Sequence, residues 1–246
     1  MIDDGSTDNS PSIARSFTDS RIRVFSDGKR KGISTRLNQA MELSNGKYFG
    51  RMDADDVSFP ERLRAQIQFL EEHPYVDLLG TGILLYTGQG FVKGIMPVKQ
   101  SHEDICRRPW RGFYLPHPTW VGKREWFLKY KYRTEADKAE DQDLLFRSFT
   151  ESRFACLPQV LLGYREEPRR LKKMFVRRYV FFRSIFLTAI NSKRYLVAMK
   201  LLLLQPAKLI ADFLNIAMGF EGLRNPILPA PVQLVEYWRT VWKTVR

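Results

Sequence analysis

Apolar residues along the first two thirds of the chain recur in two patterns, one helical and one in short continuous runs. Helical spacing, such as Ile33, Leu37, Ala40 and Met41 before the stop at Asn45-Gly46, predicts helices over 33–44, 60–72, 125–131 and 141–149. Short apolar runs predict strands over 21–25, 47–52 and 76–86, and the turn residues of 88–101 predict a hairpin or surface loop. This alternation is typical of an α/β fold with a mostly parallel sheet.

One acidic segment, Asp53-Ala54-Asp55-Asp56, comes directly after the strand predicted over 47–52. Three carboxylates this close repel one another unless a cation neutralises them. A hard divalent ion such as Mg²⁺ or Mn²⁺, shared with a substrate phosphate, would do so. A solvated acidic turn is the alternative interpretation of these residues.

A second acidic segment opens the chain, where Asp3 and Asp4 follow Met1-Ile2. After a glycine turn, a helix is expected to be entered at Ser10 with Pro11 at its first position. Open α/β sheets bind ligands at loops of this kind, beside the carboxyl ends of strands. A polar turn with a helix cap explains the same residues without a ligand.

In their order and spacing, these segments resemble the family 2 glycosyltransferases of the GT-A fold. The matching pieces are Ile2-Asp3-Asp4-Gly5-Ser6-Thr7-Asp8, Gly32-Ile33-Ser34 with Asn38, Gly46-Lys47-Tyr48, Asp53-Ala54-Asp55-Asp56, Pro60-Glu61-Arg62-Leu63, His117-Pro118-Thr119 and Ala139-Glu140-Asp141-Gln142-Asp143-Leu144. The resemblance implies a GT-A domain over 1–165 with a mostly parallel sheet. Relatives carry a strand, a turn and a helix before their Asp-Asp-Gly-Ser segment, so we expect the chain to lack its first strand and helix. We therefore expect it to be truncated at its N-terminus and inactive in this form.

The resemblance also implies a reaction, the inverting transfer of a sugar from a nucleotide-diphosphate sugar to a hydroxyl acceptor, with a Mg or Mn ion. Asp3, Asp4 and Asn38 match nucleotide-binding positions, and Asp4 corresponds to the aspartate that meets the nucleobase. Asp53 corresponds to the ribose contact. Asp55 corresponds to the metal ligand, and Asp56 is expected as an alternate ligand.

The segment that begins at Glu140 implies the other half of the chemistry. Asp141 matches the general base of the family, with Glu140 and Asp143 in support, whereas helix capping explains the same acids without catalysis. His117 is expected to touch the acceptor or the diphosphate, or else to be a hydrogen-bonded turn residue. The Gln-x-x-Arg-Trp signature of processive relatives is missing, which favours a single transfer per binding event. Leu37 stands where many relatives carry arginine.

Charge divides the chain unevenly. The formal net charge is +13, and from Arg165 onward 16 Lys and Arg face 5 Asp and Glu, a net of +11. We therefore expect a polyanionic partner for a basic, amphipathic helical tail over 166–246. No uninterrupted apolar stretch reaches the roughly 18 to 20 residues of a spanning helix. Basic, aromatic-rich helices favour an anionic membrane surface, and no recognition motif supports nucleic acid. Packing on the catalytic domain is the alternative.

Together, family and tail predict a peripheral enzyme at the cytoplasmic, inner face of the cell membrane. Its acceptor would be a saccharide or a lipid-linked sugar, and its product a surface polysaccharide or glycolipid. Cys106 and Cys156 fit reduced core residues of a cytosolic protein. Two alternatives stay open: a nucleotidyltransferase of similar fold, which would not need Glu140 and Asp141, and an inactive remnant that binds membrane.

Overall fold

The computed structural model describes residues 1–166, 171–217 and 227–245. Its α-helices are α1 (Ser10–Arg15), α2 (Ile33–Leu43), α3 (Arg62–Glu72), α4 (His102–Cys106), α5 (Arg124–Tyr130), α6 (Glu140–Ser148), α7 (Leu171–Asn191), α8 (Tyr195–Ala217) and α9 (Val232–Thr244). Its strands are β1 (Tyr48–Gly50), β2 (Val57–Ser58), β3 (Leu78–Tyr86), β4 (Val92–Met96), β5 (Val121–Lys123) and β6 (Phe154–Arg165). Short 3₁₀ turns are η1 (Pro109–Arg111), η2 (His117–Thr119) and η3 (Thr134–Ala136). The helices predicted from spacing are confirmed as α2, α3, α5 and α6.

The strands form one sheet in the order β1-β5-β3-β6-β2, with β4 on the free part of β3. All nine residues of β3 are buried, so this strand is the centre of the fold. The prediction of a mostly parallel sheet is wrong: of the pairings between these strands, β3 with β6 is parallel, and the other four are antiparallel. The turn between β3 and β4 is too short for a crossover, so these two strands must run in opposite directions.

The strand predicted over 21–25 is also wrong in its extent. A single parallel bridge joins Phe25 to Ile2, where the Asp3 amide donates to the Phe25 carbonyl at 2.8 Å. Arg21 and Arg23 face solvent, and Ile22, Val24 and Phe25 are only half-buried, so the segment is not drawn into the sheet along its whole length. The bridge still fixes the loop that carries Asp3 and Asp4.

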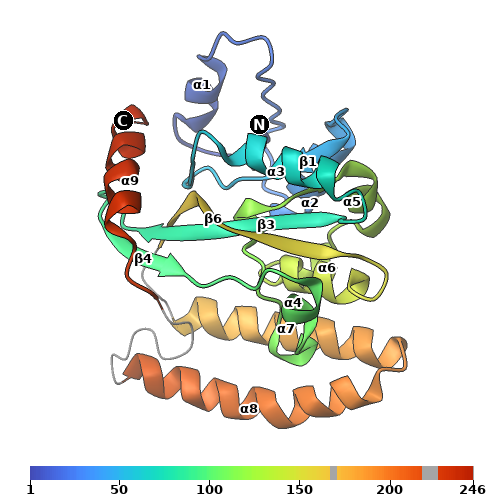
Figure 1. The fold of residues 1–246 in the computed structure, drawn as a ribbon. Coiled ribbons are helices and arrows are strands. Elements are labelled where there is room, and N and C mark those ends of the chain that lie inside the picture. The colour runs from blue at the N-terminus through green and yellow to red at the C-terminus, as the bar shows by residue number, and fades with distance from the viewer. Residues whose placement is uncertain (167–170, 218–226, 246) are drawn as a thin grey trace.

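Helices from the last third of the chain complete two hydrophobic clusters. Ile185 of α7 and Leu201 of α8 are fully buried with Trp120 and Phe127 in the main cluster. Trp238 of α9, also fully buried, belongs to a second cluster beside β2, β3 and β4. Figure 1 shows α7 and α8 as an antiparallel pair with α8 outermost, whereas α9 stands apart, against β4. In the part of the chain that the structure describes, no helix combines the length and apolar content needed to cross a membrane.

Candidate functional site

The first acidic loop is held against the start of α2. Asp4 accepts hydrogen bonds from the amides of Lys31 (2.7 Å) and Gly32 (3.1 Å) and from Nε of Arg36 (3.0 Å). Burial opposes ionisation of Asp4, but these donors outweigh it and lower its pKa. Asp3 accepts from Ser26 at 2.6 Å and from the Ser6 amide, and the hydroxyl of Ser26 lowers the pKa of Asp3 to about 2. Both carboxylates are therefore charged at neutral pH.

Arg36 is the residue of this loop that the sequence patterns missed. Its side chain is almost fully buried, and its guanidinium pairs with Asp4 and, at 2.6 Å, with Asp27. Its position is one residue before Leu37, where many relatives carry arginine. Because this arginine stands one residue before the position where relatives carry theirs, the motif comparison did not identify it. Its guanidinium points inward and orients Asp4.

Asn38 lies two residues further along α2 and faces away from this loop. Its amide nitrogen donates to the Tyr132 carbonyl and its oxygen accepts from the Tyr132 amide, both at 2.9 Å. The side chain therefore joins α2 to the segment before η3. In this arrangement Asn38 positions the loop that carries Tyr132.

The second acidic segment forms a turn between β1 and β2. The Asp56 amide donates to the Asp53 carbonyl at 3.2 Å, and the Tyr86 hydroxyl donates to the Asp55 carbonyl at 2.6 Å. Asp53 is paired with Arg51, whose charge opposes the rise in the pKa of Asp53 that burial causes. The Asp55 carboxylate is exposed, so it is the member of the turn most open to a ligand.

The buried carboxylate of Asp56 has an unpaired oxygen that could bind a metal ion. Its side chain is buried, Oδ1 accepts from the Arg165 amide at 3.0 Å, and Oδ2 has no hydrogen-bond partner. Burial raises the pKa of Asp56 to about 7, and the charges of Asp53 and Asp55 add to the rise. Among the described residues no three His, Cys, Asp or Glu side chains gather as a complete metal site. One or two carboxylates with a substrate phosphate are enough for Mg²⁺, and Asp55 with the unpaired oxygen of Asp56 fits that demand.

A buried chain of polar groups lies between the aspartate turn and α6. The Tyr132 hydroxyl contacts Nε2 of His117 at 2.8 Å, and Nδ1 of His117 is 3.8 Å from Glu140. Burial, together with Arg51, holds the pKa of His117 well below its usual range, so His117 is neutral and makes no ion pair with Glu140. Burial raises the pKa of Glu140 to about 7.

Tyr132 shows that the two acidic regions converge. Burial raises the pKa of this phenol, Asp141, Glu140 and Asp53 add to the rise, and Arg51 opposes it. Charges from the aspartate turn and from the start of α6 therefore act on one buried hydroxyl. Contacts agree with this: the Arg62 guanidinium donates to the Arg51 carbonyl, just before the aspartate turn, at 2.7 Å and to the Pro118 carbonyl, beside His117, at 3.1 Å.

At the start of α6, Asp141 and Asp143 have different surroundings. Asp141 is half-buried and accepts a hydrogen bond from Gln142 at 3.1 Å. Asp143 is buried, pairs with Arg147 at 2.8 Å, and accepts from Ser184 of α7. Asp143 thus fixes α6 on α7, whereas Asp141 is accessible to a substrate.

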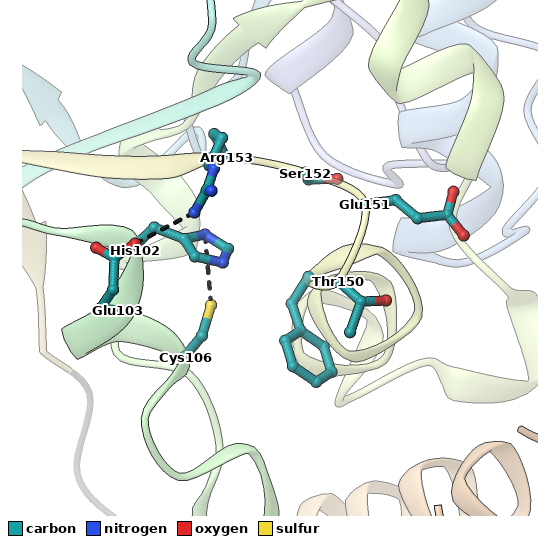
Figure 2. Close-up of a pocket in the computed structure, with 8 residues that line it drawn as sticks. His102, Glu103, Cys106, Thr150, Glu151, Ser152 and Arg153 are labelled. Carbon is teal, nitrogen blue, oxygen red and sulfur yellow. Dashed lines mark hydrogen bonds and ion pairs between the residues drawn. The ribbon is translucent and has the colours of Figure 1, made fainter. Parts of the chain in front are cut away.

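Two cavities lie away from these acids. One, of about 550 Å³, is bounded by α4 and the segment after α6, with Cys106 Sγ 3.7 Å from His102 and Arg153 3.2 Å from Glu103 (Figure 2). Burial raises the pKa of Cys106 to about 12, so the thiol stays protonated and is no nucleophile. The other, of about 560 Å³, lies between β4 and α9 beside Trp242.

Comparison with known proteins decides the family. Residues 1–131, more than half of the chain, match the family described as "Glycosyl transferase family 2". The chain belongs to glycosyl transferase family 2. It is 31% identical to EpsE of Bacillus subtilis over 180 residues, which are 70% of this chain and 64% of EpsE. Over 107 residues it is 24% identical to "UDP-Glc:alpha-D-GlcNAc-diphosphoundecaprenol beta-1,3-glucosyltransferase WfgD" of Escherichia coli, covering 44% of this chain and 42% of WfgD. The chain thus spans less than two thirds of either relative.

Solved structures of low sequence identity share the fold of this family 2 member. The mannosyltransferase PcManGT from Pyrobaculum calidifontis, in complex with GDP-Man and Mn²⁺, aligns over 99% of this chain and 75% of its own, with a TM-score of 0.55 and 17% identity. The GT-A class expected from the motifs is therefore confirmed. At this identity the likeness concerns the fold alone.

Proposed function

We propose that the protein transfers a sugar from a nucleotide-diphosphate sugar to a hydroxyl acceptor, with inversion and with a Mg²⁺ or Mn²⁺ ion at Asp55 and Asp56. The observation that carries the proposal is the buried connection between the two acidic segments, in which Arg62 donates to the Arg51 and Pro118 carbonyls and His117 lies between Tyr132 and Glu140. A site with a cation-binding half and a proton-accepting half can stabilise a leaving diphosphate and activate a hydroxyl together.

The nucleotide half consists of fixed carboxylates. Asp4, oriented by Arg36, would accept a hydrogen bond from the base, with Asp3 holding the loop, and Asp53 would bind the ribose. Asn38, which bonds the Tyr132 backbone, would position the buried chain between the two halves. When bound by Asp55 and Asp56, the divalent ion supplies Lewis-acid stabilisation of the charge that develops on the diphosphate.

The acceptor half consists of Asp141 and its support. As the acceptor oxygen forms its bond to the anomeric carbon, the bond from that carbon to the diphosphate breaks and the acceptor proton passes to Asp141. Attack from the side opposite the leaving group inverts the anomeric centre. Glu140, the residue before Asp141, and His117, 3.8 Å from Glu140, would hold the local hydrogen bonds.

The same proposal extends to the biological setting. WfgD is named for a diphosphoundecaprenol acceptor, which supports a lipid-linked acceptor and polysaccharide or glycolipid synthesis here. A lipid acceptor and a basic tail favour work at an anionic membrane surface on the cytoplasmic side.

Binding of Mn²⁺ with UDP or GDP tests the assignment of the turn. Asp55→Ala should remove the Mn²⁺-dependent part of nucleotide binding by calorimetry without lowering the thermal stability, because the carboxylate is exposed. Asp104→Ala on α4 is the matched control, since it removes an exposed acid away from the turn and should leave binding unchanged. Unchanged metal dependence in Asp55→Ala would contradict the assignment.

Substrate screens separate the reaction from its alternative. A nucleotide-sugar panel should give slow donor hydrolysis or transfer, and Asp141→Asn should reduce transfer by about 10²-fold or more while donor binding stays constant. Turnover of nucleoside triphosphates with sugar phosphates instead would identify a nucleotidyltransferase.

A further inference from the structure

One side of α8 is apolar and exposed from Leu196 to Phe213. We call it the outward stripe and define it by Leu196, Met199, Leu202, Leu203, Ile210 and Phe213, which are between 50% and 69% exposed. With 3.6 residues per turn, these positions fall within roughly a third of the helix circumference. Ala198, Leu201 and Gln205 occupy the buried side. One side of the helix therefore packs against the rest of the protein, and a second, apolar side stays exposed.

The described part of the chain places nothing over this stripe, since α8 is the outermost helix of the pair (Figure 1). Contiguous exposed apolar surfaces of this kind mark protein or membrane contacts. The choice between those partners depends on charge.

Charge in the two helices is almost entirely positive. Between 171 and 217 the sequence has nine Lys and Arg and one acidic residue, a net of +8. Each basic group near an anionic lipid surface contributes about 1 kcal/mol. Apolar side chains on one side of a helix, with basic residues around them, are the composition of helices that lie in the membrane interface. Charge complementarity thus favours an anionic bilayer over a second copy of this basic chain.

Contacts connect α8 to the acceptor half of the site. Gln205 donates to the Trp110 carbonyl in η1 at 3.3 Å, and Lys200 lies 4.0 Å from the Trp110 ring centroid. Two residues after η1, the Phe113 amide donates to Gln142 at 2.7 Å, and Gln142 precedes Asp143 and follows Asp141. The buried side of α8 and Gln142, the neighbour of Asp141, therefore both contact one short segment, 109–113, and the outward stripe lies on another side of the same helix.

We propose that the outward stripe of α8 inserts into the interfacial layer of an anionic bilayer and thereby holds the Asp141 end of the site near the membrane. The reference to the site rests on the proposed function, whereas the docking itself does not. It follows that lipid binding and nucleotide binding are separable by mutation.

Sedimentation with vesicles tests the proposal in the full chain. The wild type should pellet with vesicles of phosphatidylcholine and phosphatidylglycerol at low salt, and less with phosphatidylcholine alone or at high salt. The double variant Leu202→Glu, Leu203→Glu should weaken the partition constant by about tenfold or more, because two inserted apolar side chains become anionic. Leu63→Glu is the matched control, since this leucine of α3 is 58% exposed but lies outside the stripe, and it should bind as the wild type does.

Two further measurements make the outcome decisive. Thermal unfolding and Mn²⁺-dependent nucleotide binding of the double variant should match the wild type, which separates docking from the proposed function. Equal pelleting of the double variant and the wild type would overturn the proposal. So would a dimer in light scattering that the double variant converts to a monomer, because the stripe would then be covered by a second copy. If the wild type bound vesicles but showed no metal-dependent nucleotide binding, the result would contradict the proposed function only.

Discussion

Helices α8 and α9 both come from the basic last third of the chain, but they use their apolar residues in opposite ways. Leu203 of α8 is 69% exposed, whereas Trp238 of α9 is completely buried. The indole of Trp238 donates to the Gly90 carbonyl at 2.8 Å, and its ring lies where a Cβ at Gly163 would be. Composition alone makes the two helices look like one amphipathic tail. Packing shows that α8 offers a surface and α9 completes a core.

This difference places α9, and not α8, next to the aspartate turn. The rings of Trp238 and Tyr86 are 4.7 Å apart between centroids, and the Tyr86 hydroxyl donates to the Asp55 carbonyl at 2.6 Å. The ring of Phe59, just after β2, also lies 5.9 Å from the Trp238 ring between centroids. A residue near the C-terminus therefore supports a turn formed in the first quarter of the chain.

The largest effect is expected from Trp238→Ala. Loss of a fully buried tryptophan should lower the free energy of unfolding by about 3–5 kcal/mol. The support of Tyr86 is lost with it, so Mn²⁺-dependent nucleotide binding should weaken in whatever fraction stays folded. Urea unfolding and calorimetry measure the two effects. A Trp238→Ala variant with wild-type stability and normal nucleotide binding would contradict the claim that α9 completes the core and supports the aspartate turn.

A smaller effect is expected from the pH dependence of Asp56, the buried acid of the same turn. Its pKa is raised from about 3.8 to about 7, mainly by burial, so the folded state holds a proton that the unfolded state has released. The stability that this proton gives is complete below pH 4 and is lost as the pH rises to 7, on the order of a few kcal/mol. Urea unfolding in EDTA at pH 5 and pH 8 should show this loss for the wild type and not for Asp56→Asn. A pH-independent difference between the two proteins would mean that Asp56 is not buried as an acid.

Tyr86→Phe should have a more local effect, because the ring stays and only the hydrogen bond to Asp55 is removed. Burial raises the pKa of Tyr86 to about 12, so the phenol is a donor at neutral pH. One neutral hydrogen bond is worth about 0.5–1.5 kcal/mol, which corresponds to a loss of Mn²⁺ affinity of roughly 2- to 13-fold. Titration by electron paramagnetic resonance measures free Mn²⁺, with Tyr237→Phe as the control. Equal affinities of Tyr86→Phe and the wild type would show that α9 packs beside the turn without positioning it.

The smallest effect is expected from Leu203→Ser on α8, with a buried leucine of the same helix as its comparison. Leu203→Ser should change the free energy of unfolding by less than about 0.5 kcal/mol, since the side chain is mostly exposed. Leu201→Ala, two residues earlier and fully buried, should cost about 2–5 kcal/mol. A large loss in Leu203→Ser would mean that the outward stripe is covered in the free protein.

Local patterns predicted the helices and the acidic turn well because both depend on residues close in sequence. The apolar spacing around Leu37 and the acids of Asp53–Asp56 are examples. Arg36 was missed because its role depends on Asp4, 32 residues earlier. The direction of the strands was missed because helix and strand alternation does not specify where a strand of two or three residues inserts. Neither Tyr86 nor Trp238 has any local mark of a supporting role, because their contact joins segments 152 residues apart.

Because α9 follows the sheet in the sequence, it is made after the strands that it covers. A ribosome makes the chain from its N-terminus at about 5–20 residues per second, and early segments begin to fold before the later ones exist. Every strand that α9 covers is made before α9 is. The nascent protein can thus assemble its sheet while the aspartate turn is still unsupported, and the turn reaches its final geometry only when Trp238 arrives. Completion of this site therefore waits for a helix whose Trp238 is made 182 residues after Asp56.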